Sequence, residues 1–139
     1  DALQKAHGVA FPEPGQETEQ GAVSCLWTGR DQAFLIGTLP DDALRNHAAL
    51  TDQSDAWAVV AVEGAGAMDV LARLIPLDLR PSAFGPGRVA RSLCGHMSVV
   101  IHCTGADAFR IMAFRSMAQT LVHELDVAAA GVAARGQAR

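Results

Sequence analysis

The stretch AWAVVAVEGAGAMDVLARLIP, residues 56–76, decides the fold because its hydrophobic period changes halfway along. Residues 56–64 form a continuous apolar run rich in valine that ends at a glycine, which predicts a strand buried on both faces or nearly so. Residues 65–76 predict a helix with one apolar face, stopped by its final proline. That face carries Met68, Leu71, Leu74 and Ile75.

Three more strands and a helix follow. Residues 77–88 are rich in proline and glycine and predict a loop. Residues 88–105 predict a hairpin that turns at Gly95, and residues 107–114 predict the next strand. The last helix begins with Ser116 as its N-cap. Its apolar stripe is Met117, Leu121, Leu125 and Ala128 or Ala129.

Upstream of residue 56 the pattern is weaker. Prolines, a glycine and acidic residues make residues 1–21 an extended arm instead of a core element. Strands are predicted over 22–28 and 32–37, with Gly29 in the turn between them. The stretch PDDALRNHAAL, residues 40–50, predicts a short helix.

The order from residue 56 is therefore strand, helix, strand, strand, strand, helix, with short connections between most strands. This order predicts an α+β fold, a mainly antiparallel sheet with helices packed on one face. A chain of 139 residues has the length of one domain. We expect a single domain, 1–139, with an extended arm at 1–21, an α+β core at 22–130 and a frayed tail at 131–139.

The composition excludes several classes of protein. Half of the residues are hydrophobic and 19% are charged, which excludes a disordered chain. The net charge is −4 without a run of Lys or Arg, so neither nucleic acid nor a membrane surface is an expected partner. No apolar run reaches the ~18 residues of a membrane span, and no leader sequence opens the chain. The sequence leaves open whether residues precede Asp1, which is not a methionine.

Three cysteines lie inside apolar runs: Cys25, Cys94 and Cys103. Their number is odd and no CxxC motif occurs. This pattern favours buried free thiols in a reducing cytoplasm over a disulfide.

The stretch TDQSDAW, residues 51–57, gathers hydroxyls and carboxylates before the first core strand. Ser54 beside Asp52 and Asp55 suggests a nucleophile with acids, but a catalytic triad also needs a base, normally His, and an oxyanion hole. The stretch contains no His, and no GxSxG motif occurs. Asp and Ser also form turns through their own side chains. We interpret the stretch as a structural turn, with Trp57 as a core or interface anchor.

Two other patterns suggest ligand sites only faintly. Cys94, His96 and His102 are possible metal ligands, but Gly95 predicts a turn between the first two, and no carboxylate is spaced to complete the site. The stretch GAGAMDVL, from Gly64, lacks the Lys-Ser/Thr of a phosphate loop and the third glycine of a dinucleotide site. The start of an ordinary helix explains it better.

Four arginines are spread over the predicted strands: Arg88, Arg91, Arg110 and Arg115. They are either solvated charges at a sheet edge or ion-pair partners for a larger protein, and both interpretations stay open. Nothing in the sequence assembles a catalytic, cofactor or metal site. The apolar content is high for a short chain without tyrosine. Exposed apolar patches commonly mark interfaces, so the composition favours a subunit over an independent catalyst.

A dispersed set of residues over 51–126 points to a family. The set is Asp52-Gln53-Ser54, Trp57, Gly64, Leu71, Leu74, Asp78-Leu79, Phe84, Gly87, Arg91, His96-Met97, Phe109 and Phe114-Arg115-Ser116. Together with the hairpin at 22–37, this pattern resembles the gamma subunit of heterotetrameric sarcosine oxidase. The resemblance implies a fold like the folate-binding domain of aminomethyltransferases.

The resemblance also implies a function. Complexes of this kind oxidise sarcosine to glycine, formaldehyde equivalents and hydrogen peroxide, and form methylenetetrahydrofolate when tetrahydrofolate is present. The partners would be the alpha, beta and delta subunits, which would carry the FAD, FMN, NAD, zinc and tetrahydrofolate; this chain would carry no cofactor. In folate-using relatives an acidic residue contacts the pterin, whereas the corresponding turn here, Cys94-Gly95-His96-Met97, has no carboxylate.

We therefore expect a non-catalytic, cytoplasmic gamma subunit that serves the assembly and stability of its complex. Its expected interface residues are Trp27, Trp57, Phe84 and Arg91. Two alternatives stay open. One is a free-standing folate-binding or one-carbon-transfer protein of the same fold, and the other is an oligomeric scaffold unrelated to amine oxidation.

If TDQSDAW is a structural turn, Ser54→Ala lowers the free energy of unfolding by about 1 kcal/mol, because one side-chain hydrogen bond is lost. Chemical denaturation measures this change. Loss of turnover in a fully assembled complex carrying the variant would contradict the structural interpretation.

Overall fold

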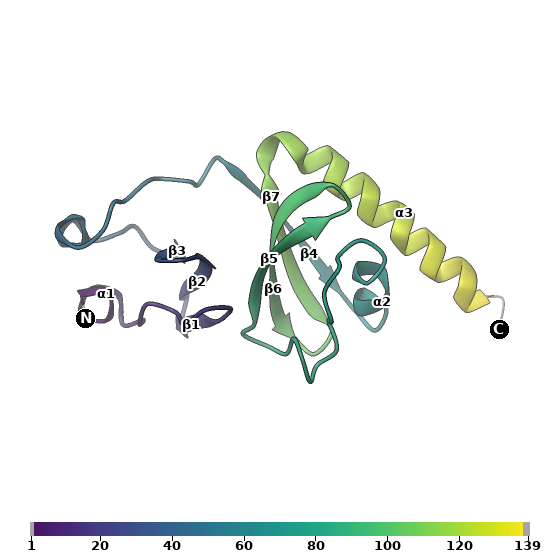
Figure 1. Ribbon diagram of the computed structural model, residues 1–139, viewed down its shortest axis with the longest axis horizontal. Coiled ribbons are helices and arrows are strands. Elements are labelled where there is room, and N and C mark those ends of the chain that lie inside the picture. Colours follow the sequence, from purple (N-terminus) through teal and green to yellow (C-terminus); the bar gives the residue numbers. More distant parts are fainter. Residues whose placement is uncertain (1, 138–139) are drawn as a thin grey trace.

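The computed structural model describes residues 2–137 and contains two antiparallel sheets and a layer of helices (Figure 1). The elements are, in chain order, α1 (Ala2–His7), β1 (Glu17–Gln20), β2 (Val23–Gly29), β3 (Gln32–Ile36), the 3₁₀ helix η1 (Asp42–Asn46), β4 (Trp57–Glu63), α2 (Ala67–Leu71), β5 (Val89–Cys94), β6 (Met97–Gly105), β7 (Ala108–Phe114), the 3₁₀ helix η2 (Arg115–Met117) and α3 (Ala118–Gln137).

The larger sheet has four strands in the order β4-β7-β6-β5, and every neighbouring pair is antiparallel. β5 and β6 form the predicted hairpin, in which Cys94 pairs with Met97 across a two-residue turn. Gly95 has a φ of 58° there, which glycine adopts at little cost. The predicted turn at Gly95 is thus confirmed. The predicted strands 56–64 and 107–114 correspond to β4 and β7.

Helices α2 and α3 cover one face of this sheet, as the sequence predicts. Side chains alternate along a strand, so Phe109, Ile111 and Ala113 of β7 point to the same face. They pack in one buried cluster with Leu71 of α2 and Leu121 of α3. The α+β class, with a mainly antiparallel sheet and helices on one face, is confirmed.

A smaller sheet of three strands, β1-β2-β3, packs on the opposite face. Leu26 of β2 meets Val89, Val100 and Met112 of the larger sheet in a second buried cluster. Burial of these four side chains holds the two sheets together through the hydrophobic effect. The sequence predicts the β2–β3 hairpin but not its position.

One polar contact also joins the two sheets. Glu17 of β1 lies with its Oε2 atom 2.7 Å from Nε2 of His102 on β6. The side chain of His102 is only 3% exposed, and that of Glu17 is 11% exposed. A hydrogen bond between side chains with so little exposure is stronger than one between fully exposed groups. The pair therefore fixes how β1 sits against β6.

Two expectations about the ends of the chain differ from the secondary structure that is observed. Residues 1–21 contain α1 and β1, and Val9 is buried. The polar sequence of β1 does not resemble a strand, but its backbone pairs with β2, and tertiary pairing overrides weak propensity. In the tail, α3 continues to Gln137, because alanines favour helix. Residues 138–139 lie outside the described residues.

The predicted helices differ in length and start. Residues 40–50 contain only η1, where Oδ1 of Asp41 accepts a hydrogen bond from the Ala43 N–H at 2.8 Å. The helix predicted over 65–76 is confined to α2 and followed by turns. Ser116 lies within η2 and is not the N-cap of α3.

β4 is not buried on both faces. It is an edge strand, and Val59 is 57% exposed. A half-buried strand ordinarily alternates apolar and polar residues, so the continuous apolar run of β4 leaves apolar side chains such as Val59 exposed at the edge of the sheet.

None of the helices within residues 2–137 is long and apolar enough to cross a membrane.

The contact between Glu17 and His102 predicts a measurable coupling. Glu17→Ala leaves a buried imidazole without its partner and lowers the free energy of unfolding by about 1–3 kcal/mol. Glu19→Ala, at an exposed position two residues further along the same strand, changes it by less than about 0.5 kcal/mol. Urea denaturation of both variants, of His102→Ala and of the double variant gives the coupling energy, which we expect to exceed about 0.5 kcal/mol. Additive losses in the double variant would contradict the role given to this pair.

Candidate functional site

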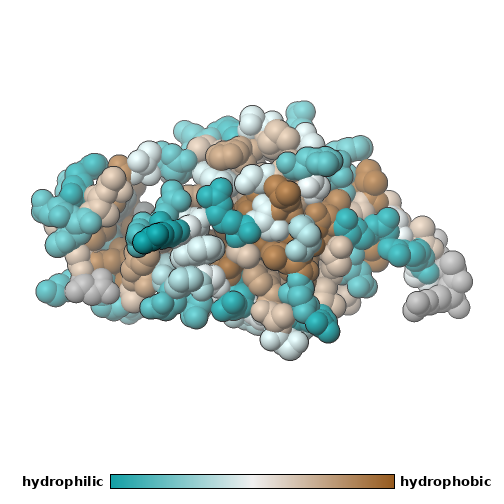
Figure 2. Space-filling model, in the orientation of Figure 1, coloured by the Kyte–Doolittle hydropathy of each residue, from teal (hydrophilic) through white to brown (hydrophobic). Residues whose placement is uncertain are grey.

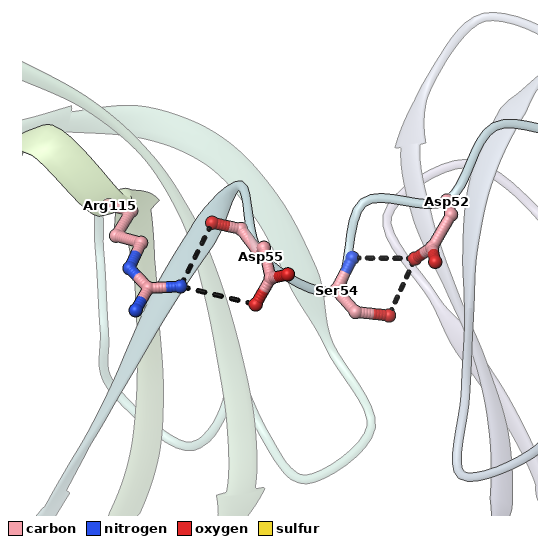
Figure 3. A network of polar contacts seen from close by, with 4 residues as sticks. All are labelled: Asp52, Ser54, Asp55 and Arg115. Atoms are coloured by element: carbon pink, nitrogen blue, oxygen red, sulfur yellow. Dashed lines mark hydrogen bonds and ion pairs between the residues drawn. The ribbon is translucent and has the colours of Figure 1, made fainter.

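The TDQSDAW stretch is a turn with its polar groups satisfied locally (Figure 3). Oδ1 of Asp52 accepts hydrogen bonds from the Ser54 N–H at 2.9 Å and from the Ser54 hydroxyl at 2.6 Å. These bonds hold the pKa of Asp52 below its usual value. Asp55 points the other way, and its Oδ1 lies 3.2 Å from Nη1 of Arg115. These bonds between Asp52 and Ser54 confirm the interpretation of the stretch as a structural turn.

Trp57 anchors the end of this turn. Its ring lies 4.7 Å from that of Phe114 and 5.1 Å from that of Phe34, measured between centroids. Its Nε1 donates a 3.3 Å hydrogen bond to Oε1 of Gln53. Phe34 belongs to the small sheet and Phe114 to the large one, so Trp57 links both sheets to the segment between them. A contact of Trp57 with a partner stays a prediction.

The suggested metal ligands do not converge. The side chain of Cys94 is buried on the helix-covered face, His96 is exposed in the hairpin turn, and His102 is buried on the opposite face beside Glu17. Within residues 2–137, no group of three or more His, Cys, Asp or Glu side chains could hold a metal ion. The turn at Gly95 separates the first two, as the sequence predicts.

The cysteines are free and buried. Burial raises the pKa of the Cys25 thiol to about 11. Burial also raises the pKa values of Cys94 and Cys103, and the nearby charge of Glu124 adds to the effect at Cys94. Because the thiolate is the reactive form of cysteine, these raised pKa values favour the protonated, unreactive thiol at neutral pH. The prediction of buried free thiols is confirmed.

The stretch from Gly64 is the start of a short helix. Gly64 has a φ of 111°, which lets the chain leave β4 sharply, and its carbonyl accepts a hydrogen bond from the Ala67 N–H at 2.8 Å. α2 has five residues and begins without a side-chain cap. The local structure fits ordinary helix initiation.

The four arginines do not form one cluster. Arg115 pairs with Asp55, and Arg91 reaches the carbonyl oxygen of Thr28 at 3.5 Å, across the two sheets. Arg88 and Arg110 are exposed. Two of the four therefore have partners inside the chain.

The expected interface residues fall into different environments. Phe84 is 7% exposed and belongs to the core beneath the helices, where it does not reach the surface. In the loop before Phe84, Asp78 accepts hydrogen bonds from the backbone N–H and the guanidinium of Arg80. These hydrogen bonds lower the pKa of Asp78 to about 2. Trp27 is half-buried and Arg91 is exposed.

Two hollows lie on the surface. A cleft of about 410 Å³ between the sheets is lined by charged or polar residues and two loop residues: Glu17, Glu19, Pro86, Gly87, His102, Thr104 and Arg110. Nδ1 of His102 is buried and has no hydrogen-bond partner among the described residues. The sequence gives no signal of this cleft, because Glu17 and His102 are 85 residues apart.

The second hollow is an apolar groove of about 490 Å³ beside β4. Residues 60–67 and Val70 line one side of it, and α3 lines the other with a stripe from Val122 to Ala133. Val122 is 45% exposed. More generally, Figure 2 shows apolar side chains reaching the surface over the part of the molecule that holds the larger sheet.

Comparisons with known proteins agree with the sequence resemblance. Residues 5–131 match the family described as "Sarcosine oxidase, gamma subunit family". The chain is 29% identical over 135 residues to sarcosine oxidase subunit gamma of Corynebacterium sp. (strain U-96), covering 89% of this chain and 65% of that relative. The chain thus spans just under two thirds of the relative's length.

A solved structure gives the same result. A chain of the heterotetrameric sarcosine oxidase from Corynebacterium sp. U-96, in complex with pyrrole 2-carboxylate, is similar with a TM-score of 0.81 and 27% identity. That similarity covers 94% of this chain and 72% of the other. Since the family match extends over most of the sequence, this chain belongs to the sarcosine oxidase gamma subunit family.

Proposed function

We propose that this chain is a non-catalytic subunit of a heterotetrameric sarcosine oxidase and serves the assembly and stability of that complex. The match of residues 5–131 to the gamma subunit family carries this proposal. The similarity to a chain of a heterotetrameric sarcosine oxidase supports it.

The local chemistry supports the non-catalytic role. Ser54 and Asp52 bond to each other, Asp55 pairs with Arg115, and Glu17 pairs with His102. Each of these polar groups thus contacts another residue of the same chain. A nucleophile would need a neighbouring base, which Ser54 lacks.

The finer features of the proposal follow the family. The partners would be alpha, beta and delta subunits, and these would carry FAD, FMN, NAD, zinc and tetrahydrofolate. The complex would oxidise sarcosine to glycine with formation of hydrogen peroxide and methylenetetrahydrofolate. Three buried free thiols suit a reducing cytoplasm, where we place the complex.

Coexpression tests the assembly role. A tagged form of this chain, produced together with candidate alpha, beta and delta subunits of a sarcosine oxidase, is expected to copurify with them in a fixed ratio. Omission of this chain is expected to lower the yield or thermal stability of the remaining complex. A chain that purifies alone while the others assemble fully without it would contradict the proposal.

The alternative, a free-standing folate-binding or one-carbon-transfer protein, is favoured by the cleft that Glu17, Thr104 and Arg110 help to line. Thermal unfolding of the isolated chain separates the two functions. Our proposal predicts no change in Tm with about 1 mM tetrahydrofolate, whereas a folate site with a micromolar Kd would be stabilised by about 4 kcal/mol at that concentration. A rise of several degrees, saturating with ligand, would favour the alternative.

A further inference from the structure

We propose that the outer edge of β4 and the groove beside α3 receive an extended strand from another subunit, which continues the larger sheet. The strand would be apolar at alternate positions and carry Lys or Arg at the end that lies beside Glu63. This inference rests on the proposed function, because it names the surface through which the chain meets its complex.

The backbone of β4 offers hydrogen-bonding groups on its outer side. In an antiparallel pair, successive residues point their N–H and C=O groups alternately toward and away from the neighbouring strand. The carbonyl of Ala56 accepts from the Arg115 N–H at 2.8 Å, and the Gly64 N–H donates to the Asp107 carbonyl at 2.9 Å. The backbone N–H and C=O groups of the even-numbered residues of β4 therefore face β7. The groups of Val59, Ala61 and Glu63 point outward and have no hydrogen-bond partner among residues 2–137.

β4 also lacks the features that protect an edge strand from pairing. Such edges commonly carry charges, proline or a bulge. Residues 57–62 contain no charge or proline, and the register with β7 is unbroken. The opposite edge differs: β5 carries Arg91 and lies against β2, and Arg88 just before it bridges to Gln16. Only the β4 edge of this sheet is left both apolar and open within the described residues.

The groove gives an added strand a place for its side chains. Val60 and Val62 point toward the helices and form one wall, and the α3 stripe from Val122 to Ala133 forms the other. A strand beside β4 would direct alternate side chains into this groove of about 490 Å³. The remaining side chains would cover Val59, which is 57% exposed. Main-chain pairing and alternate side-chain pockets are the two parts of recognition by strand addition.

The charges favour a basic partner over a second copy. Glu63 and Asp126 are the charged residues that line the groove, and no Lys or Arg joins them. β4 itself, WAVVAVE, has no basic residue. A second copy paired along β4 would bring more acid and no base. A strand with Lys or Arg would instead place opposite charges together.

A matched pair of valines on α3 tests the inference. Val122 lines the groove, whereas Val127 does not, and the two are 45% and 56% exposed. Val122→Glu adds a buried acid to the proposed interface. We expect it to reduce copurification with the other subunits at least tenfold, whereas Val127→Glu stays within twofold of the wild type. Ala61→Pro removes an N–H that points outward and makes no hydrogen bond to β7. We expect it to reduce copurification as Val122→Glu does.

Urea denaturation checks that each variant is folded, and a photoreactive residue in place of Val59 identifies the occupant. We expect a crosslink to one other subunit. A crosslink to a second copy, or one confined to this chain, would overturn the inference. Full copurification of folded Val122→Glu and Ala61→Pro chains would also overturn the inference. That result would not contradict the proposed function. Failure of the wild-type chain to copurify would overturn both.

Discussion

The antiparallel pairing of β4 with β7 is the constraint on which the rest of the structure depends. It pairs residues 57–63 with residues 108–114 in an unbroken register and so adds β4 to the sheet that the later strands form. Because α2 follows β4 and α3 follows β7, the pairing also brings both helices to one face of the sheet. The opposite face then remains for the small sheet, and the outer side of β4 remains open.

The larger sheet could be predicted from the sequence because its signals are local. The valine-rich run ends at Gly64, a glycine divides β5 from β6, and a mostly apolar run marks β7. The small sheet could be predicted only in part. β2 and β3 have hairpin chemistry, but β1 is polar and becomes a strand through its pairing with β2. The limits of α2 and η1 could not be predicted, because packing and the local caps decide where short helices end.

The candidate site shows the same division. The bonds of Asp52 with Ser54 lie within three residues and follow from known turn chemistry. The pair of Glu17 and His102 depends on how two sheets pack, which no local pattern encodes. The apolar run of residues 56–64 predicts a strand buried on both faces or nearly so, whereas β4 is an edge strand on which Val59 is 57% exposed. A strand whose composition suits burial on both faces fits a protein that acquires its last neighbour on assembly.

Hydrogen–deuterium exchange at β4 shows whether a strand from another subunit covers this edge. The amides of Val59, Ala61 and Glu63 point away from β7, so in the isolated chain they exchange faster than those of Val60 and Val62. In the assembled oxidase, we expect these three outward amides to exchange at least tenfold more slowly, at rates in the range of their neighbours. Equal exchange rates at these three positions in the free chain and in the complex would show that no strand covers the edge of β4.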